Sequence, residues 1–226
     1  MKWLDSCVKG HTSCSEATSR TGWNPSRLLD VGSSESPILR LHETSYIQDE
    51  ITYTTLSHCW GKIPIHRLLT SNLEDMKVSI DPSVLTKSFR EAIEITRRMH
   101  KRYLWIDSLC IIQDSVDDWR FESQLMGSVY QYGFCNIAAT SGHDGRSGCF
   151  FDRSTLLIQP LVVQASWSGR TVLGTLKERE LSTNKLIAGE YCVYRGEWPQ
   201  QIETAPLNQR AWVCPFLNSF PNLSRL

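Results

Sequence analysis

The chain of 226 residues is long enough to bury a substantial core, and its 41% hydrophobic and 21% charged residues are typical of a globular domain. Lys and Arg together number 24, as do Asp and Glu, and this zero net charge argues against a nucleic-acid or anionic-membrane partner. No apolar run approaches the roughly 20 residues that a membrane-spanning helix requires.

The first ten residues include Asp5 and Lys9 and lack the apolar segment of a secretion signal. Disulfide scaffolds are usually small secreted domains that cannot build a sufficient core, whereas this chain can. We therefore expect a cytoplasmic protein whose eight cysteines are reduced.

The N-terminal part of the chain is polar and rich in turn-forming residues, so we expect residues 1–36 to form an extension. Within it, Cys7, His11 and Cys14 have the spacing C-x3-H-x2-C, which could supply three ligands to zinc. A closed structural zinc site needs four ligands, and the fourth is not evident from the sequence.

Two strands are expected next, over residues 38–42 and 51–57, and the second is rich in β-branched residues. The clearest helix is predicted over residues 81–101. Asp81 can cap its N-terminus and Pro82 suits the first helical position. Apolar residues then recur on one face at helical spacing, and basic residues in the last turn suit the negative end of the helix dipole.

A strand that ends in polar groups follows this helix directly. Residues 103–106 are aromatic or apolar, which suits a buried strand. Asp107 stands at its carboxyl end, with Cys110, Gln113 and Asp114 close behind. In open α/β sheets, ligands bind just outside the carboxyl ends of the strands, so this run predicts a functional site.

A second helix is predicted over residues 116–132, and it carries a carboxylate on its apolar face. The spacing places Glu122 between Trp119 and Met126 on one side of the helix. A carboxylate in such a position is costly unless it is paired, hydrogen-bonded or open to a pocket.

Two interpretations of Glu122 remain open. In the structural one, Glu122 pairs with a nearby Arg or accepts a hydrogen bond from a loop amide. In the functional one, partial burial raises its pKa, and the carboxyl serves as an acid, a base or a stabiliser of the transition state.

The remaining pattern predicts a strand over residues 135–140 and weaker strands over residues 156–163 and 191–194. Strand, helix, strand, helix and strand follow one another between residues 51 and 140. This order predicts an α/β fold in which helices flank a parallel sheet with right-handed crossovers, followed by a weaker β-containing C-terminal part.

The turn after the strand at 51–57 is expected to meet Asp107 at the same edge of the sheet. It contains Ser57, His58, Trp60 and Gly61. Trp60 and Gly61 could form a tight turn with a core indole, or an aromatic wall on which a ring stacks. Asp107 could cap the loop that follows it or take part in chemistry.

Cys110 could be a nucleophile of the Cys/His type together with His58. No family-specific nucleophile signature surrounds Cys110, which disfavours this interpretation. The chain also lacks the glycine-rich phosphate-binding motifs of nucleotide hydrolases and of dinucleotide-binding folds.

Four motifs in order resemble the heterokaryon-incompatibility (HET) domain of filamentous fungi. The motifs lie at residues 53–61, 103–114, 118–130 and 208–213. On this resemblance, residues 37–213 form the domain. The chain then departs from the family's closing pattern, so residues 214–226 are expected to be an aberrant or truncated tail.

The resemblance implies a role in non-self recognition and in the programmed death of incompatible fused cells. It also implies self-association and a second incompatibility protein as partner. Proteins similar to this family also occur beside genes of secondary metabolism, so a biosynthetic role is an alternative.

The family is remotely similar to Toll/interleukin-receptor (TIR) domains, which are flavodoxin-like folds, and some of these cleave NAD with a helical Glu. The resemblance implies Glu122 as the corresponding residue, with Asp107 and Ser57 lining the same crevice. In this alternative NAD is the substrate, and no cofactor is assigned. The residues expected to bind the ligand are His58, Trp60, Gly61 and Gln113.

Overall fold

The computed structural model describes most of the residues between 23 and 151, together with short segments elsewhere. The described residues are 6–7, 9–10, 23–33, 35–45, 47, 51–151, 161–165, 189–193 and 205–207. The chain divides into two compact units, Met1–Phe151 with Glu203–Leu226 and Asp152–Ile202.

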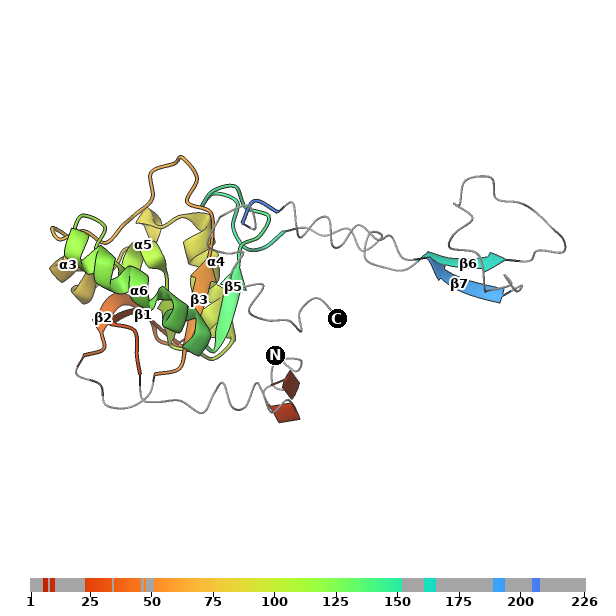
Figure 1. The fold of residues 1–226 in the computed structure, drawn as a ribbon, viewed down its shortest axis with the longest axis horizontal. Helices are drawn as coiled ribbons and strands as arrows, with labels where there is room; N and C mark the ends of the chain where they lie inside the picture. Colours follow the sequence, from red (N-terminus) through yellow and green to blue (C-terminus); the bar gives the residue numbers. More distant parts are fainter. Residues whose placement is uncertain are drawn as a thin grey trace. The chain divides into compact units, whose positions relative to one another are not determined.

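The first unit is built on a sheet of five strands in the order β2–β1–β4–β3–β5 (Figure 1). The strands are β1 (Arg27–Gly32), β2 (Pro37–Glu43), β3 (Tyr53–Ser57), β4 (Tyr103–Trp105) and β5 (Cys135–Ala138). Strand β3 pairs in parallel with both β4 and β5, as the order of elements predicted. Strand β1 pairs antiparallel with β2 and β4, so the sheet is mixed.

Helices complete the α/β arrangement of this unit. They are α3 (Leu73–Val78), the short 3₁₀ helix η1 (Pro82–Val84), α4 (Lys87–Arg98), α5 (Asp107–Cys110) and α6 (Val116–Tyr132). The hydroxyl of Tyr53 donates to the carbonyl of Val129 in α6, whereas the Thr54 hydroxyl bonds that of Thr96 in α4. Successive strand residues point to opposite faces, so α4 and α6 cover opposite faces of the sheet.

Strand β1 lies inside the region that the sequence assigned to a polar extension. All six of its residues are buried. Asp30 is tolerated there because Arg102 donates to its two oxygens at 2.8 and 2.9 Å. The structure therefore differs from the expected extension over residues 27–32, since the two charged residues of this strand, Arg27 and Asp30, are both paired and do not prevent its burial.

The helix predicted over residues 81–101 is interrupted. Asp81 caps η1 by accepting a hydrogen bond from the Ser83 amide, and the chain is then extended at Leu85 before α4 begins. Leu85 is buried, so the break inserts an apolar side chain into the core. The cap of α4 is instead Thr86, whose hydroxyl accepts from the Phe89 amide.

Helix α6 has the bounds that the sequence predicted, but a different buried face. Glu122 and Val129 are buried in it, whereas 51% of Trp119 is exposed. The placement of Trp119 on the inner face was therefore wrong. The inner face instead follows Asp118, Glu122 and Val129, which are spaced by four and seven residues.

The second unit contains two described strands, β6 (Leu161–Ala165) and β7 (Gly189–Val193), which pair antiparallel. They overlap the two weaker strands expected in this part of the sequence. Within the described residues of the chain, no helix has the length and apolar character to cross a membrane.

Candidate functional site

Asp107 joins the turn after β3 to the end of β4. Its carboxylate accepts a hydrogen bond of 2.9 Å from the Trp60 indole and one of 2.7 Å from the backbone amide of Ser108. Only 9% of Asp107 is exposed. The structure thus brings Trp60 and Asp107 together, and the carboxylate both anchors the indole and begins helix α5.

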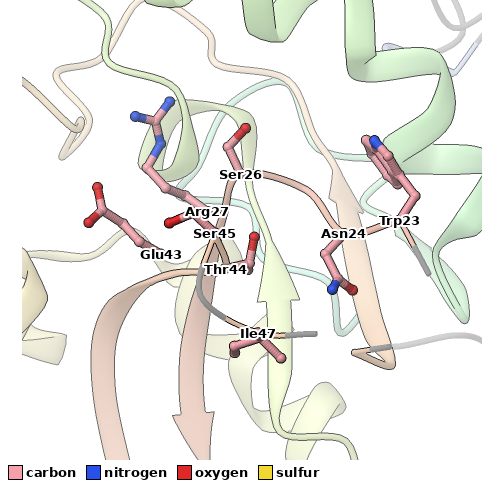
Figure 2. A pocket seen from close by; sticks show the side chains of 8 residues that line it. All are labelled: Trp23, Asn24, Ser26, Arg27, Glu43, Thr44, Ser45 and Ile47. Carbon is pink, nitrogen blue, oxygen red and sulfur yellow. The ribbon is translucent and has the colours of Figure 1, made fainter. Parts of the chain in front are cut away.

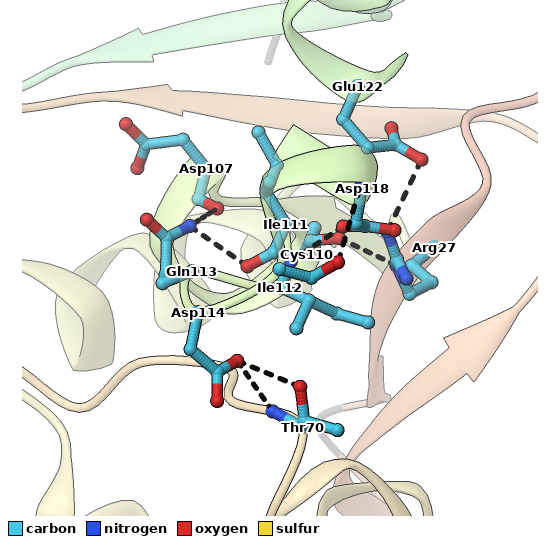
Figure 3. A network of polar contacts seen from close by, with 11 residues as sticks. Arg27, Thr70, Asp107, Cys110, Ile111, Ile112, Gln113, Asp114, Asp118 and Glu122 are labelled. Carbon is cyan, nitrogen blue, oxygen red and sulfur yellow. Dashed lines mark hydrogen bonds and ion pairs between the residues drawn. The ribbon is translucent and has the colours of Figure 1, made fainter. Parts of the chain in front are cut away.

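The loop after α5 is fixed by its own polar side chains (Figure 3). The amide of Gln113 donates to the backbone carbonyls of Asp107 and Ile111 at 3.2 and 2.9 Å. Asp114 accepts from the amide and hydroxyl of Thr70, and these hydrogen bonds hold the pKa of Asp114 below its usual value. Gln113 and Asp114 therefore stabilise the loop.

Glu122 belongs to a buried cluster organised by Arg27, at the start of β1. Nη2 of Arg27 donates to both oxygens of Asp118 at 2.6 and 2.7 Å, and it lies 3.3 Å from Oε1 of Glu122. Nε of Arg27 donates to the carbonyl of Cys110 at 2.8 Å, and the amide of Ile112 donates to Asp118. The cluster links β1, α5 and α6.

Burial raises the pKa of Glu122, since only 2% of the residue is exposed and a charged carboxylate loses its hydration there. A hydrogen bond from Ser26 and the positive charge of Arg27 oppose this shift. Glu122 is therefore paired with a cation, and burial nevertheless keeps its pKa above the ordinary value.

Cys110 lies beside this cluster and is buried. Burial raises the pKa of its thiol to about 12. A thiol with such a pKa carries almost no thiolate at neutral pH, and the thiolate is the reactive form. The structure therefore disfavours the nucleophile interpretation of Cys110 and supports a packing role.

Ser57 makes its contact with β5, which flanks β3 on the side away from β4. Its hydroxyl donates to Oδ1 of Asn136 in β5 at 3.2 Å, and the hydroxyl of Thr55 donates to the same atom at 3.0 Å. No hydrogen bond or ion pair among the described residues joins Ser57, Asp107 and Glu122 to one another. In Figure 3 the carboxylates of Asp107 and Glu122 point away from each other.

His58 and Gly61 complete the turn after β3. His58 is buried with its ring edge-on to Phe89, at 4.9 Å between ring centroids. Gly61 has a φ of 68°, and a side chain there would meet Cβ of Asp144 at 2.4 Å. The turn needs glycine at this position because the loop containing Asp144 packs directly against it.

A cavity of about 390 Å³ borders the Arg27 cluster (Figure 2). It is lined by residues from the start of β1 and the end of β2, among them Trp23, Asn24, Ser26, Arg27, Glu43 and Thr44. In Figure 2, Arg27 and Glu43 lie at one end of the cavity and Trp23 at the other. Ser26 and Arg27, which contact Glu122, also line this cavity.

Sequence reasoning missed Arg27 because it lies in the expected extension, and it therefore also missed the cavity that Arg27 lines together with the end of β2. The apolar residues Leu28, Leu29 and Val31 around Asp30 were the available signal, since no glycine or proline interrupts this run before Gly32.

The zinc ligands predicted in the N-terminal part fall mostly outside the described residues. Cys7 is described and half-buried, whereas His11 and Cys14 lie outside the described part. Among the residues that are described, no group of three or more His, Cys, Asp or Glu side chains could hold a metal ion. Zinc binding by Cys7, His11 and Cys14 stays a prediction.

The family described as heterokaryon incompatibility protein (HET) matches residues 53–214, well over half of the chain. This range includes β3, β4, β5 and the helices α3 to α6, and with them Asp107, Asp118 and Glu122. No curated protein and no solved structure matches the chain.

Proposed function

Since the chain belongs to the heterokaryon incompatibility (HET) family, we propose that it acts in the cytoplasm of fused fungal cells and triggers their programmed death through protein–protein association. The family match over residues 53–214 carries this proposal. The partners are other copies of this chain and a second incompatibility protein.

The polar groups of the candidate site support association rather than chemistry. Asp107 holds Trp60 and the start of α5, and Glu122 lies against the guanidinium of Arg27. Helix α6 in turn exposes apolar side chains, with 64% of Val116 and 51% of Trp119 accessible. Exposed aromatic residues are common energetic centres of protein interfaces.

Expression of the chain in a fungal strain that lacks it tests this proposal. We expect loss of viability, scored with a membrane-impermeant dye, and self-association measured by sedimentation. Trp119→Ser should weaken both effects because it removes an exposed aromatic contact. Val78→Ser is the matched control, because Val78 is 77% exposed on α3. Equal viability loss with both variants, or no loss with the parent chain, would contradict the proposal.

A second candidate is NAD cleavage by Glu122 in a TIR-like, flavodoxin-like fold. Its support is the raised pKa of Glu122 and the fact that Ser26 and Arg27, which contact this carboxyl, also line the 390 Å³ cavity. A carboxylate can stabilise the cationic sugar that forms as a glycosidic bond breaks. A role in secondary metabolism would favour a pocket lined by Trp60, Trp105 or Trp119. None of these three residues lines this cavity.

Incubation of the associated protein with NAD separates the two candidates. Nicotinamide release by the parent chain and its loss in Glu122→Gln would support the enzyme. Absence of release, combined with undiminished killing by Glu122→Gln, would leave association as the function.

A further inference from the structure

A second cavity, of about 470 Å³, lies at the opposite end of β1 from Arg27. It is formed by the turn between β1 and β2, the last turn of α4 and the segment that leads into β4. The residues that give it its character are Gly32, Ser33, Arg97, His100, Lys101 and Arg102. Two arginines and a lysine therefore line one hollow.

Arg97 is the fixed cation of this cavity. Its Nε donates to the carbonyl of Val31 at 2.7 Å, and its Nη2 donates to that of Ile38 at 3.1 Å. These acceptors are neutral, and no carboxylate among the described residues forms an ion pair with Arg97. Arginine stays protonated in proteins, so a positive charge is held here without a counter-ion from the described residues.

Lys101 adds a second charge, and no carboxylate of the described residues forms an ion pair with it. Its ammonium group lies 4.0 Å from the centroid of the Phe134 ring, a contact that leaves the charge uncompensated. Arg102 is different, because it forms a bidentate pair with Asp30. Glu35 is the acidic residue of the lining, so the cavity keeps an excess of positive charge.

Basic residues at the end of α4 suit the helix dipole, but the dipole does not explain the position of Arg97. Arg98, one residue on, pairs with Glu94 on the helix surface, and 69% of its side chain is exposed. Arg97 is instead held between β1 and β2 beside a hollow that is open to solvent, with the Nη1 donors uncommitted in the described residues.

We propose that this cavity binds a phosphate group through Arg97 and Lys101. A guanidinium fork and an ammonium group are the two side chains that recognise phosphate oxygens in proteins. The group belongs either to a small phosphorylated molecule or to a lipid headgroup, which share this chemistry. The inference is independent of the proposed function, because it concerns the other end of the sheet.

Titration of the full 226-residue chain with inorganic phosphate, at constant ionic strength set with chloride, tests the proposal. Saturable NMR shifts at Gly32, Ser33 and the Arg97 Nε are expected. Arg97→Gln and Lys101→Gln should each weaken phosphate binding by about tenfold or more, since each removes one charged contact. Arg98→Gln, the matched control, should change it less than about twofold.

Arg97→Gln keeps one donor for the carbonyl of Val31 or Ile38, so the turn between β1 and β2 retains one of its two hydrogen bonds to this side chain. If Arg97→Gln does not fold, phosphate binding by Lys101→Gln tests the proposal instead. Vesicles of phosphatidylcholine with and without a phosphoinositide distinguish the sources. Binding to free phosphate without binding to vesicles would identify a small phosphorylated ligand. Binding to phosphoinositide vesicles that is lost in Arg97→Gln and Lys101→Gln would identify a lipid headgroup. No saturable binding in either arm, or equal weakening by Arg98→Gln, would overturn the proposal.

Discussion

Arg27 connects three parts of the chain through one guanidinium group. It contacts Asp118, Glu122 and the carbonyl of Cys110, and its own side chain is 8% exposed. Burying these charges is costly, and the cost is offset only while the donors and acceptors all remain paired. The cluster is therefore a point at which a single substitution has a large effect.

Arg27→Met should lower the free energy of unfolding by about 3–5 kcal/mol, because it leaves the carboxylates of Asp118 and Glu122 buried without their cation. Urea denaturation followed by tryptophan fluorescence measures this change. Arg120→Met is the control, since Arg120 lies on the outer face of α6 with 71% of its side chain exposed. It should shift stability by less than about 0.5 kcal/mol, and equal effects of both variants would refute a special role for Arg27.

Glu122 should make stability depend on pH. Its pKa is raised in the folded chain by burial. The unfolded chain therefore gives up this proton first as the pH rises. The stabilisation is fully present below the ordinary pKa of Glu and is lost as the pH rises through the higher folded value.

Glu122→Gln removes this titration while keeping the shape of the side chain. The stability of the parent chain relative to the variant should fall between acidic and neutral pH, as measured by urea midpoints across that range. A difference between the two proteins that does not change with pH would show that burial does not shift the pKa of Glu122.

The sequence predicted part of this site and could not predict the rest. Glu122 stood out because a carboxylate on the inner face of a helix needs a partner. The sequence did not identify that partner, because Arg27 lies 95 residues away in the chain. The contact between Trp60 and Asp107 was within reach, since both follow neighbouring parallel strands.

At the scale of elements, the turn between β1 and β2 depends on one glycine. Gly32 has a φ of 65°, and a side chain there would meet the carbonyl oxygen of Ser36 at 2.4 Å. The obstacle is backbone, so it cannot move aside without opening the turn.

Gly32→Ala should therefore destabilise the chain by about 1–3 kcal/mol, through strain at a left-handed position and through the clash. Thermal unfolding followed by circular dichroism measures the loss. Gly10→Ala is the control, because a side chain at Gly10 would meet no atom within 4 Å. Unchanged stability in Gly32→Ala would mean that the turn adopts another conformation.

Two helices show which signals in the sequence were sufficient to predict where a helix begins and ends. Helix α6 was predicted with its true bounds because it has no internal proline or glycine before Gly127 and begins after a capping serine. The helix predicted over residues 81–101 was interrupted because two caps, Asp81 and Thr86, follow one another closely. Helical spacing of the apolar residues alone did not reveal that Leu85, which lies between the two caps, is extended.

At the scale of the whole molecule, the sheet extends beyond the part that matches the family. The match begins at Tyr53, whereas β1 and β2 lie before it. Strand β1 pairs with β4 in the middle of the sheet, and Leu28, Leu29 and Val31 are fully buried. Removing them would expose both the edge of β4 and the core.

A fragment of residues 53–214 should therefore fail to fold, whereas residues 23–226 should unfold cooperatively. Losing three buried aliphatic side chains costs about 1.5–3 kcal/mol each, which together is comparable with the whole stability of a domain. Losing Arg27 also leaves the carboxylates of Asp118 and Glu122 uncompensated. Urea titration and amide NMR spectra of the two fragments measure the difference. A cooperative transition in residues 53–214 would show that the matched range suffices without β1.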